Sequence, residues 1–207
     1  MHSPLPDNNL AAVDDYAELR SCFDAQRESF LNSATETREE RKQHLLNLKR
    51  MITENREEII AAISRDYGNR SRHETLFAEI ITANDGIIDN IKHLKRWMKV
   101  QRRKVDQTMY PGGKARVIPQ PLGVVGLIVP WNFPINLAIS QLAAAFAAGN
   151  RAMVKMSENS IELSRLLISV APKYFSKDKL AFFEETGGVG IEFSKLPFDH
   201  LVFTGSG

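Results

Sequence analysis

Two patterns of apolar and polar positions divide the chain. Between about residues 14 and 105, apolar residues recur at intervals of three and four, the spacing of one face of an α-helix. The pattern predicts three helical segments that pack against another part of the protein, and Gly68 in the turn DYGN predicts the end of the second. The positions on these faces are Leu19, Phe23 and Phe30 in the first segment, Leu45, Leu48, Ile52, Ile59, Ile60 and Ile63 in the second, and Phe77, Ile80, Ile81, Asn84, Ile87, Ile88, Ile91, Leu94 and Met98 in the third.

From about residue 110, short apolar runs alternate with helical patterns. The letters PGG at 111–113 predict a turn, and residues 114–119 alternate as a short strand does. The run GVVGLIVP at 123–130 is typical of a strand buried on both faces. Residues 134–149 predict an Ala-rich helix with proline at its start and glycine at its end. Further strands are predicted at 151–156, 181–185 and 200–204, and further helices at 159–174 and 190–195.

This alternation predicts an α/β fold: N-terminal helices followed by a Rossmann-like, doubly wound parallel sheet that is incomplete. The boundaries we infer are an N-terminal helical part at 1–109, a hairpin at 110–121 and a Rossmann-like segment at 122–207.

Composition narrows the class of protein. Of 207 residues, 43% are hydrophobic and 25% are charged, which is ordinary for a globular protein and argues against disorder. A net charge of +2 argues against nucleic acid as the main partner. The basic stretch KHLKRWMKVQRRK at 92–104 is interpreted as a solvated helix end and linker, with nucleic-acid or acidic-membrane contact as the weaker alternative. With no signal-peptide pattern and no run of about 18 apolar residues, we expect a cytoplasmic protein that does not enter a membrane.

Polar residues follow two of the predicted strands. Ligands of parallel sheets bind beyond the carboxyl ends of the strands, so these residues are candidates for a binding site. After the first strand stands PWNFP, in which the Asn132 amide can donate two hydrogen bonds to an oxyanion. The alternative is an asparagine that caps the helix beginning at Pro134. After the second strand stands KMSE, in which Lys155 and Glu158 could hold ribose hydroxyls. The alternative is an exposed ion pair with Glu158 near a helix N-terminus.

A third cluster, FTGSG at 203–207, ends the last predicted strand in small residues. Small residues are needed where backbone amides approach a pyrophosphate, although many strand-to-loop junctions have this composition. The acids Glu184 and Glu185 stand at the end of an otherwise apolar strand, and the pattern offers no reason for them.

Taken together, PWNFP, KMSE and LPFDHLVFTGS, in this order and on successive strand ends, resemble the aldehyde dehydrogenase family. The stretch PQPLGVVGLIVPWNFPINLAISQLAAAFAAGNRAMVKMSENS matches the family almost continuously. Lys155 lies 23 positions after Asn132, which is the separation between the family's oxyanion asparagine and its ribose-binding lysine. The loop TGG at 186–188 and the run FSKLPFDHLVFTGS are most similar to the coniferyl aldehyde dehydrogenase branch, and the resemblance spans about residues 20–207.

The resemblance implies a catalytic and a ribose-binding role. Asn132 would donate its side-chain amide to the oxyanion of the thiohemiacetal. Lys155 and Glu158 would hold the adenosine ribose, and the carboxylate of Glu158 would repel a 2′-phosphate, so NAD is expected rather than NADP.

It also implies how the rest of the cofactor and the subunits are arranged. Gly205 and Ser206 would face the pyrophosphate, while Pro130 and Trp131 would line the nicotinamide half of the cleft through their backbone. The hairpin at 110–121 would belong to the bridging segment through which subunits pair. A homo-oligomer, a dimer, is therefore expected of the full-length form.

The family's mechanism uses a cysteine thiolate that attacks the aldehyde and a glutamate that activates the deacylating water. In the family both residues lie downstream of the FTGS motif. The single cysteine here, Cys22, is interpreted as a buried or half-buried apolar side chain and excludes an internal disulfide. The five histidines have no metal-site spacing, so no metal is predicted. We expect this chain alone, without the catalytic cysteine domain, to be inactive and to bind NAD weakly.

Three hypotheses for function follow. The leading one is the N-terminal, NAD-binding portion of an aldehyde dehydrogenase that oxidises an aromatic, coniferaldehyde-like aldehyde to a carboxylate. The alternative is a stand-alone nucleotide-binding or assembly module without catalysis. The third and weakest is a surface-binding protein that acts through the basic stretch.

Overall fold

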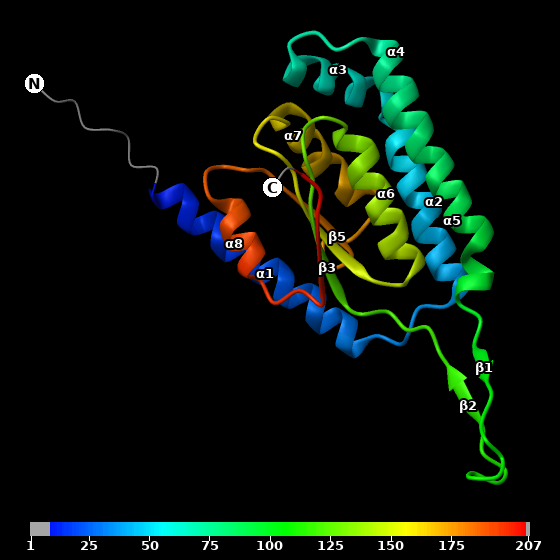
Figure 1. The fold of residues 1–207 in the computed structure, drawn as a ribbon. Helices are drawn as coiled ribbons and strands as arrows, with labels where there is room; N and C mark the ends of the chain where they lie inside the picture. Colours follow the sequence, from blue (N-terminus) through cyan, green and yellow to red (C-terminus); the bar gives the residue numbers. More distant parts are fainter. Residues whose placement is uncertain (1–8, 206–207) are drawn as a thin grey trace, which may run out of the picture.

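A four-stranded parallel sheet forms the centre of the protein (Figure 1). The structure is a computed structural model that describes the backbone of residues 9–205 and the side chains of residues 16–205. The strands are β3 (Val124–Ile128), β4 (Arg151–Lys155), β5 (Leu180–Phe183) and β6 (His200–Phe203). Their order in the sheet is β5-β4-β3-β6, so the chain winds outward from β3 in both directions. The predicted doubly wound α/β fold is confirmed.

Helices cover both faces of this sheet. On one face lie α6 (Pro134–Ala147) and α7 (Ile161–Val170), which is followed by the short 3₁₀ turn η2 (Ala171–Lys173). On the other face lie α1 (Asn9–Asn32) and α8 (Val189–Lys195). Because successive side chains of a strand point to opposite faces, Val154 of β4 belongs to the core under α6 and α7, whereas Met153 belongs to the core under α1 and α8.

The second predicted helical segment is two helices, α2 (Arg38–Glu54) and α3 (Arg56–Tyr67). Asn55 separates them with a non-helical backbone, at φ −106° and ψ 22°. Gly68 ends α3 as predicted: its φ of +74° is left-handed, which glycine adopts without a steric penalty.

The third predicted helical segment contains an inserted π-helical turn, η1 (Leu76–Ile81), between α4 (Arg72–Thr75) and α5 (Thr82–Trp97). The prediction of one continuous apolar face is wrong for Phe77 and Ile81, whose side chains are 73% and 43% exposed. A π turn holds more residues than an α turn and so shifts the residues that face inward. Here it turns Glu79 and Ile80 into the core.

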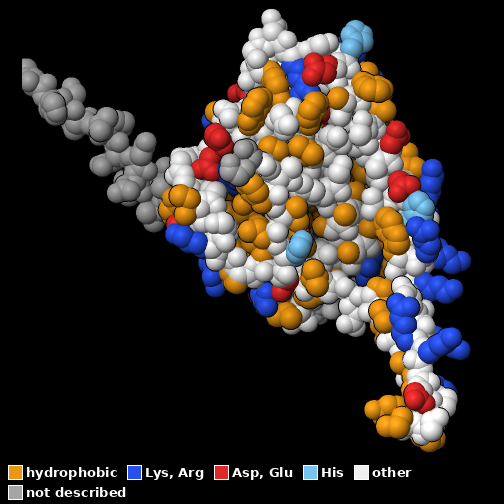
Figure 2. All heavy atoms as spheres, in the orientation of Figure 1, with side chains coloured by type: hydrophobic (Ala, Val, Ile, Leu, Met, Phe, Trp, Pro, Cys, Tyr) orange, Lys and Arg blue, Asp and Glu red, His pale blue; other side chains and the backbone are white. Residues whose placement is uncertain are grey.

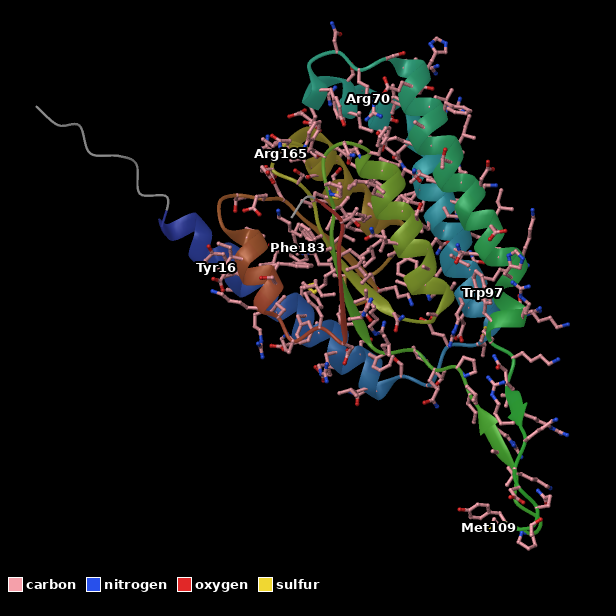
Figure 3. All side chains as sticks on the ribbon, viewed as in Figure 1. Tyr16, Arg70, Trp97, Met109, Arg165 and Phe183 are labelled. Carbon is pink, nitrogen blue, oxygen red and sulfur yellow. The ribbon has the colours of Figure 1, made fainter. Side chains whose placement is uncertain are left out.

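A two-stranded antiparallel hairpin projects from this body (Figure 1). It consists of β1 (Gln101–Arg103) and β2 (Ala115–Val117), and Figure 3 shows Met109 at its tip. β1 therefore lies in the stretch that the sequence pattern assigned to a helix end and linker. Lys and Arg side chains gather along the end of α5 and this hairpin (Figure 2). Within residues 9–205, no helix combines the length and the apolar character needed to cross a bilayer.

A buried ion pair joins the helical part to the amino end of the sheet. The Nζ atom of Lys179, whose side chain is 4% exposed, donates to Glu36 Oε1 at 2.6 Å and to the Asn150 carbonyl at 2.9 Å. His44 Nε2 lies 3.2 Å from the same carboxylate. Burial alone would raise the pKa of Glu36, but the hydrogen bonds from His44 and Lys179 outweigh it and lower the pKa to about 2.

We expect Glu36→Gln to reduce the free energy of unfolding at pH 7 by about 3 kcal/mol, because Lys179 then keeps a buried charge without its partner. A carboxylate with a lowered pKa stabilises the fold fully above its unfolded value near 4.5 and loses this contribution as the pH falls toward 2. The difference between wild type and variant should therefore shrink between pH 4.5 and 2 in urea titrations followed by circular dichroism. Glu39→Gln, an exposed acid in the first turn of α2, is the control; a constant difference across this pH range contradicts the assignment.

Candidate functional site

The carboxyl ends of the four strands lie level with one another. Ile128 of β3 pairs with Lys155 of β4 and with Phe203 of β6, and Lys155 pairs with Phe183 of β5. The residues that follow the strands therefore meet at one edge of the sheet, the carboxyl edge. The candidate residues named from the sequence all follow or end strands at this edge, except that Ser206 lies outside the described residues.

Asn132 lies in the loop between β3 and α6. Other residues donate hydrogen bonds to its backbone carbonyl, whereas its side chain is free among the described residues. The Asn132 carbonyl accepts hydrogen bonds from Arg70 Nη1 at 2.9 Å and from the Tyr67 hydroxyl. Among the described residues its side-chain amide has no hydrogen-bond partner, and the residue is exposed. It does not cap α6, so that interpretation of Asn132 is wrong. The amide is available to a ligand at the carboxyl edge.

The start of α6 is capped by a carboxylate from another helix. Glu79, on the π turn, accepts hydrogen bonds from the backbone N–H groups of Ile135 at 2.7 Å and Asn136 at 3.2 Å. An acid is favoured at a helix N-terminus, where the unpaired N–H groups carry partial positive charge. The side chain of Glu79 is fully buried, and burial raises its pKa against the opposing effects of Arg70 and these two donors.

Arg70 completes this arrangement and joins it to the Asn132 loop. Its guanidinium lies 2.9 Å from Glu79 Oε1 and 3.2 Å from Glu74 Oε1, and its side chain is 3% exposed. It sits between the rings of Tyr67 and Phe133, with centroid distances of 4.7 and 4.8 Å, in cation–π geometry. Figure 3 shows Arg70 in the connection between α3 and α4, beyond the sheet.

Pro130 and Trp131 begin the same loop. The Trp131 carbonyl accepts a hydrogen bond from the Tyr67 hydroxyl at 2.8 Å, and its indole, 49% exposed, lies 5.7 Å from the Tyr67 ring. Pro130 is half-buried. The N-terminal helical part therefore supplies the side chains that hold this loop. No single-sequence signal singles out Tyr67 or Arg70, whereas an acid such as Glu79 within an apolar helix is a weak indication of a buried partner.

Lys155 ends β4 and contacts two acids. Its Nζ atom lies 2.7 Å from Glu185 Oε2 and 4.0 Å from Glu158 Oε2, and its side chain is 9% exposed. The alternative of an exposed Lys155–Glu158 ion pair is therefore wrong for the lysine, although Glu158 is exposed. Glu184, the neighbouring acid, pairs instead with Arg165 at 3.1 Å. The two acids at the end of β5 thus have separate roles, which the sequence pattern had left unexplained.

Gly205 follows β6 and is exposed. The preceding residue, Thr204, donates its N–H to the Ile128 carbonyl at 3.1 Å, and its hydroxyl accepts from Gln141 Nε2 at 2.5 Å. The first bond continues the pairing of β3 and β6 past the strand ends, and the second joins Thr204 to α6. Gly205 therefore follows next to the end of β3.

Two other features lie away from this edge. A hollow of about 600 Å³ lined by Glu36, Gly149 and Arg151 is at the amino end of the sheet, where no candidate residue lies. Cys22, on α1, lies 3.9 Å from the Lys177 carbonyl in the turn before β5, also at the amino end. Burial raises the pKa of the Cys22 thiol to about 11, which opposes the thiolate that a nucleophile needs. Within the described residues, no three metal-ligating side chains are close enough to hold an ion.

A doubly wound sheet with polar groups gathered at its carboxyl edge places this chain in the class of α/β proteins that bind ligands beyond the ends of parallel strands, a class that includes the dinucleotide-binding folds. The family model described as "Aldehyde dehydrogenase family" matches residues 2–206. The chain belongs to the aldehyde dehydrogenase family, whose members are oxidoreductases that act on aldehydes and generally use NAD(P).

Within the family, the chain is similar to relatives named as coniferyl aldehyde dehydrogenases. The chain is 43% identical over 189 residues to a probable coniferyl aldehyde dehydrogenase of Pseudomonas aeruginosa, covering 91% of this chain and 40% of that protein. It is 44% identical over 188 residues to the coniferyl aldehyde dehydrogenase of Pseudomonas sp. strain HR199, covering 91% and 38%. Among solved structures, Staphylococcus aureus AldH in a substrate-bound state matches with a TM-score of 0.82 and 28% identity, covering 91% of this chain and 41% of that one. The chain spans about 40% of the length of the curated relatives it matches.

We expect Glu79→Gln to lower the free energy of unfolding by about 3 kcal/mol, because Arg70 would remain buried without its compensating charge. The matched control is Glu74→Gln, which removes the other acid next to Arg70; Glu74 is 55% exposed, so its loss should cost less than about 1 kcal/mol. Urea unfolding measured by circular dichroism gives both values. Equal costs for the two variants would contradict a special role for the buried carboxylate.

Proposed function

We propose that this chain is the N-terminal, cofactor-binding portion of an NAD-dependent aldehyde dehydrogenase. The observation that carries the proposal is the meeting of two groups at one edge of the sheet: the free amide of Asn132 and the ammonium of Lys155 with its acids. Membership of the aldehyde dehydrogenase family gives each of these groups a role.

The residues at the carboxyl edge fit a nicotinamide dinucleotide. Lys155 and Glu158 offer a donor and an acceptor for the two hydroxyls of an adenosine ribose, and Glu158 is exposed enough, at 63%, to turn toward it. Gly205 and Ser206 are small residues, as needed where backbone amides approach a pyrophosphate. Pro130 and Trp131 would contact the nicotinamide half. The bound cofactor would accept the hydride that leaves the substrate carbon.

The catalytic role proposed for Asn132 depends on how its loop is held. Arg70 and Tyr67 both donate to its carbonyl, and Glu79 fixes the helix that follows. The side-chain amide is therefore presented from a backbone anchored on its other side. An amide fixed in this way can stabilise a developing oxyanion without reorganising during the reaction.

The substrate we propose is an aromatic aldehyde of the coniferaldehyde type, oxidised to the carboxylate. Its support is the identity of 43–44% with relatives named for coniferyl aldehyde. The chain on its own is proposed to be inactive, because its single cysteine, Cys22, lies at the amino end of the sheet, away from Asn132, and burial raises the pKa of its thiol. A pairing role for the β1–β2 hairpin in a homodimer belongs to the same proposal.

Joining this chain to the C-terminal part of the Pseudomonas sp. relative tests the role of Asn132. We expect NAD-coupled oxidation of coniferaldehyde, and we expect Asn132→Ala to lower kcat by about 10²–10³ with little change in the Kd for NAD. The control is Asn136→Ala, an asparagine in the first turn of α6 whose side chain accepts only from Ser140 among the described residues. A chimera that folds but is inert toward all aldehydes, or an Asn132→Ala variant with full kcat, contradicts the proposal.

Titration of NAD into the 207-residue chain separates the proposal from a stand-alone nucleotide-binding module. We expect weak binding, with a Kd of about 1 mM, that is lost on Lys155→Ala. Binding at about 1 µM or tighter would favour the module. Chemical-shift changes in two-dimensional NMR detect both weak and tight binding. If no shift changes at an NAD concentration tenfold above a Kd of about 1 mM, cofactor binding by this chain is contradicted.

A further inference from the structure

The ammonium of Lys155 faces more negative charge than it can balance. Glu185 lies 2.7 Å away and Glu158 4.0 Å away, so the three side chains together carry a net charge of −1. Arg165 is paired with other acids, Glu184 at 3.1 Å and Glu162 at 3.9 Å. Among these described groups, no positive charge is left over for a further anion.

Glu185 differs from Glu158 in being rigidly held. Its Oε1 atom accepts hydrogen bonds from the N–H groups of the turn before α8, at Gly187 (3.1 Å), Gly188 (2.7 Å) and Val189 (3.0 Å). Its Oε2 atom accepts from Gly190 N at 2.8 Å in addition to Lys155. Burial raises the pKa of Glu185, but the bonds from Lys155 and Gly190 outweigh it and hold the pKa below the ordinary value, so the group is charged at neutral pH.

These contacts leave Glu185 no free acceptor. A carboxylate has about four lone-pair sites, and five donors already occupy them. Glu185 therefore acts on a ligand through Lys155 and not by direct contact. Gly190 lies directly against the pair, since a Cβ atom at this position would lie 3.0 Å from Glu185 Oε2 and 3.3 Å from Lys155 Nζ.

Glu158 is the exposed member of the three. Its side chain is 63% exposed, and it accepts a hydrogen bond from the Ser157 hydroxyl at 3.2 Å. Removing its charge leaves Lys155 still neutralised by Glu185 at the shorter distance. The loss of Glu158 alone thus does not create the net positive charge that a phosphate dianion requires.

We propose that Glu185 is a positioning residue that determines the choice between the two nicotinamide dinucleotides, by holding Lys155 in place and cancelling its charge. A ribose with a free 2′-hydroxyl is accepted, because it needs one donor at a fixed place. A ribose carrying a 2′-phosphate is rejected, and it stays rejected when Glu158 is neutralised. This inference rests on the proposed function, since it concerns the same adenosine subsite.

The test measures the affinity of the 207-residue chain for 5′-AMP and for adenosine 2′,5′-bisphosphate by NMR titration. These probes differ only in the 2′-phosphate and do not involve the nicotinamide half. The variants are Glu158→Gln, Glu185→Gln, Glu185→Asp and the double variant with both glutamines. Glu184→Gln, one position from Glu185 and paired with Arg165, is the matched control.

We expect wild type and Glu158→Gln each to prefer 5′-AMP by at least tenfold. Glu185→Gln should reduce this preference at least tenfold relative to Glu184→Gln, Glu185→Asp should retain it, and the double variant should abolish it. The ratio of the two affinities is informative because a general loss of structure would weaken both probes alike.

Three results would overturn the inference. If Glu158→Gln alone abolishes the preference, Glu158 is the determinant, and this outcome is decisive even where Glu185→Gln does not fold. If Glu185→Gln changes the ratio no more than Glu184→Gln does, the inference fails while the adenosine subsite stands. If wild type binds neither probe, the proposed cofactor-binding function fails with it.

Discussion

The buried carboxylate of Glu79 is the constraint on which the carboxyl edge depends. A charge in the core is tolerated only when opposite charge and hydrogen-bond donors surround it, and Glu79 finds Arg70 on one side and the start of α6 on the other. Because Arg70 also donates to the Asn132 carbonyl, the same charge fixes the loop after β3. The π turn directs the Glu79 side chain into the core, so this pairing depends on the irregular turn.

Glu185 repeats this arrangement at the end of β5. Its carboxylate also accepts hydrogen bonds from N–H groups at the start of a helix, and it pairs with a buried cation, Lys155. At the opposite edge, Lys179 and Glu36 tie the helical part to β5. The helices that connect parallel strands begin with backbone N–H groups that have no partner within the helix. Here the carboxylates of Glu79 and Glu185 accept hydrogen bonds from such groups. The loops that carry the candidate chemistry are therefore held from outside the sheet.

The strands and most helices could be predicted because their pattern is strong. The run at 123–130 has no polar side chain, and β3 is buried along most of its length. The helix from Pro134 ends at Ala147, and Gly149 follows it with a positive φ. The interruption at Asn55 and the π turn at Leu76–Ile81 were not predictable, because both keep a helical spacing of apolar residues on either side. β1 was missed because it is short and consists of polar residues, and only its pairing with β2 makes it a strand.

The amino-acid sequence by itself determined the doubly wound fold, the family resemblance and the positions of Asn132, Lys155 and Glu158 on successive strand ends, since these depend on periodicity and on short contiguous motifs. Only the tertiary structure decided which charges meet. Arg70 and Glu79 lie nine positions apart, and Lys155 and Glu185 lie thirty apart, so no local pattern links them. Their pairing follows from helix packing and strand order, which bring distant residues into contact where burial makes an unpaired charge too costly.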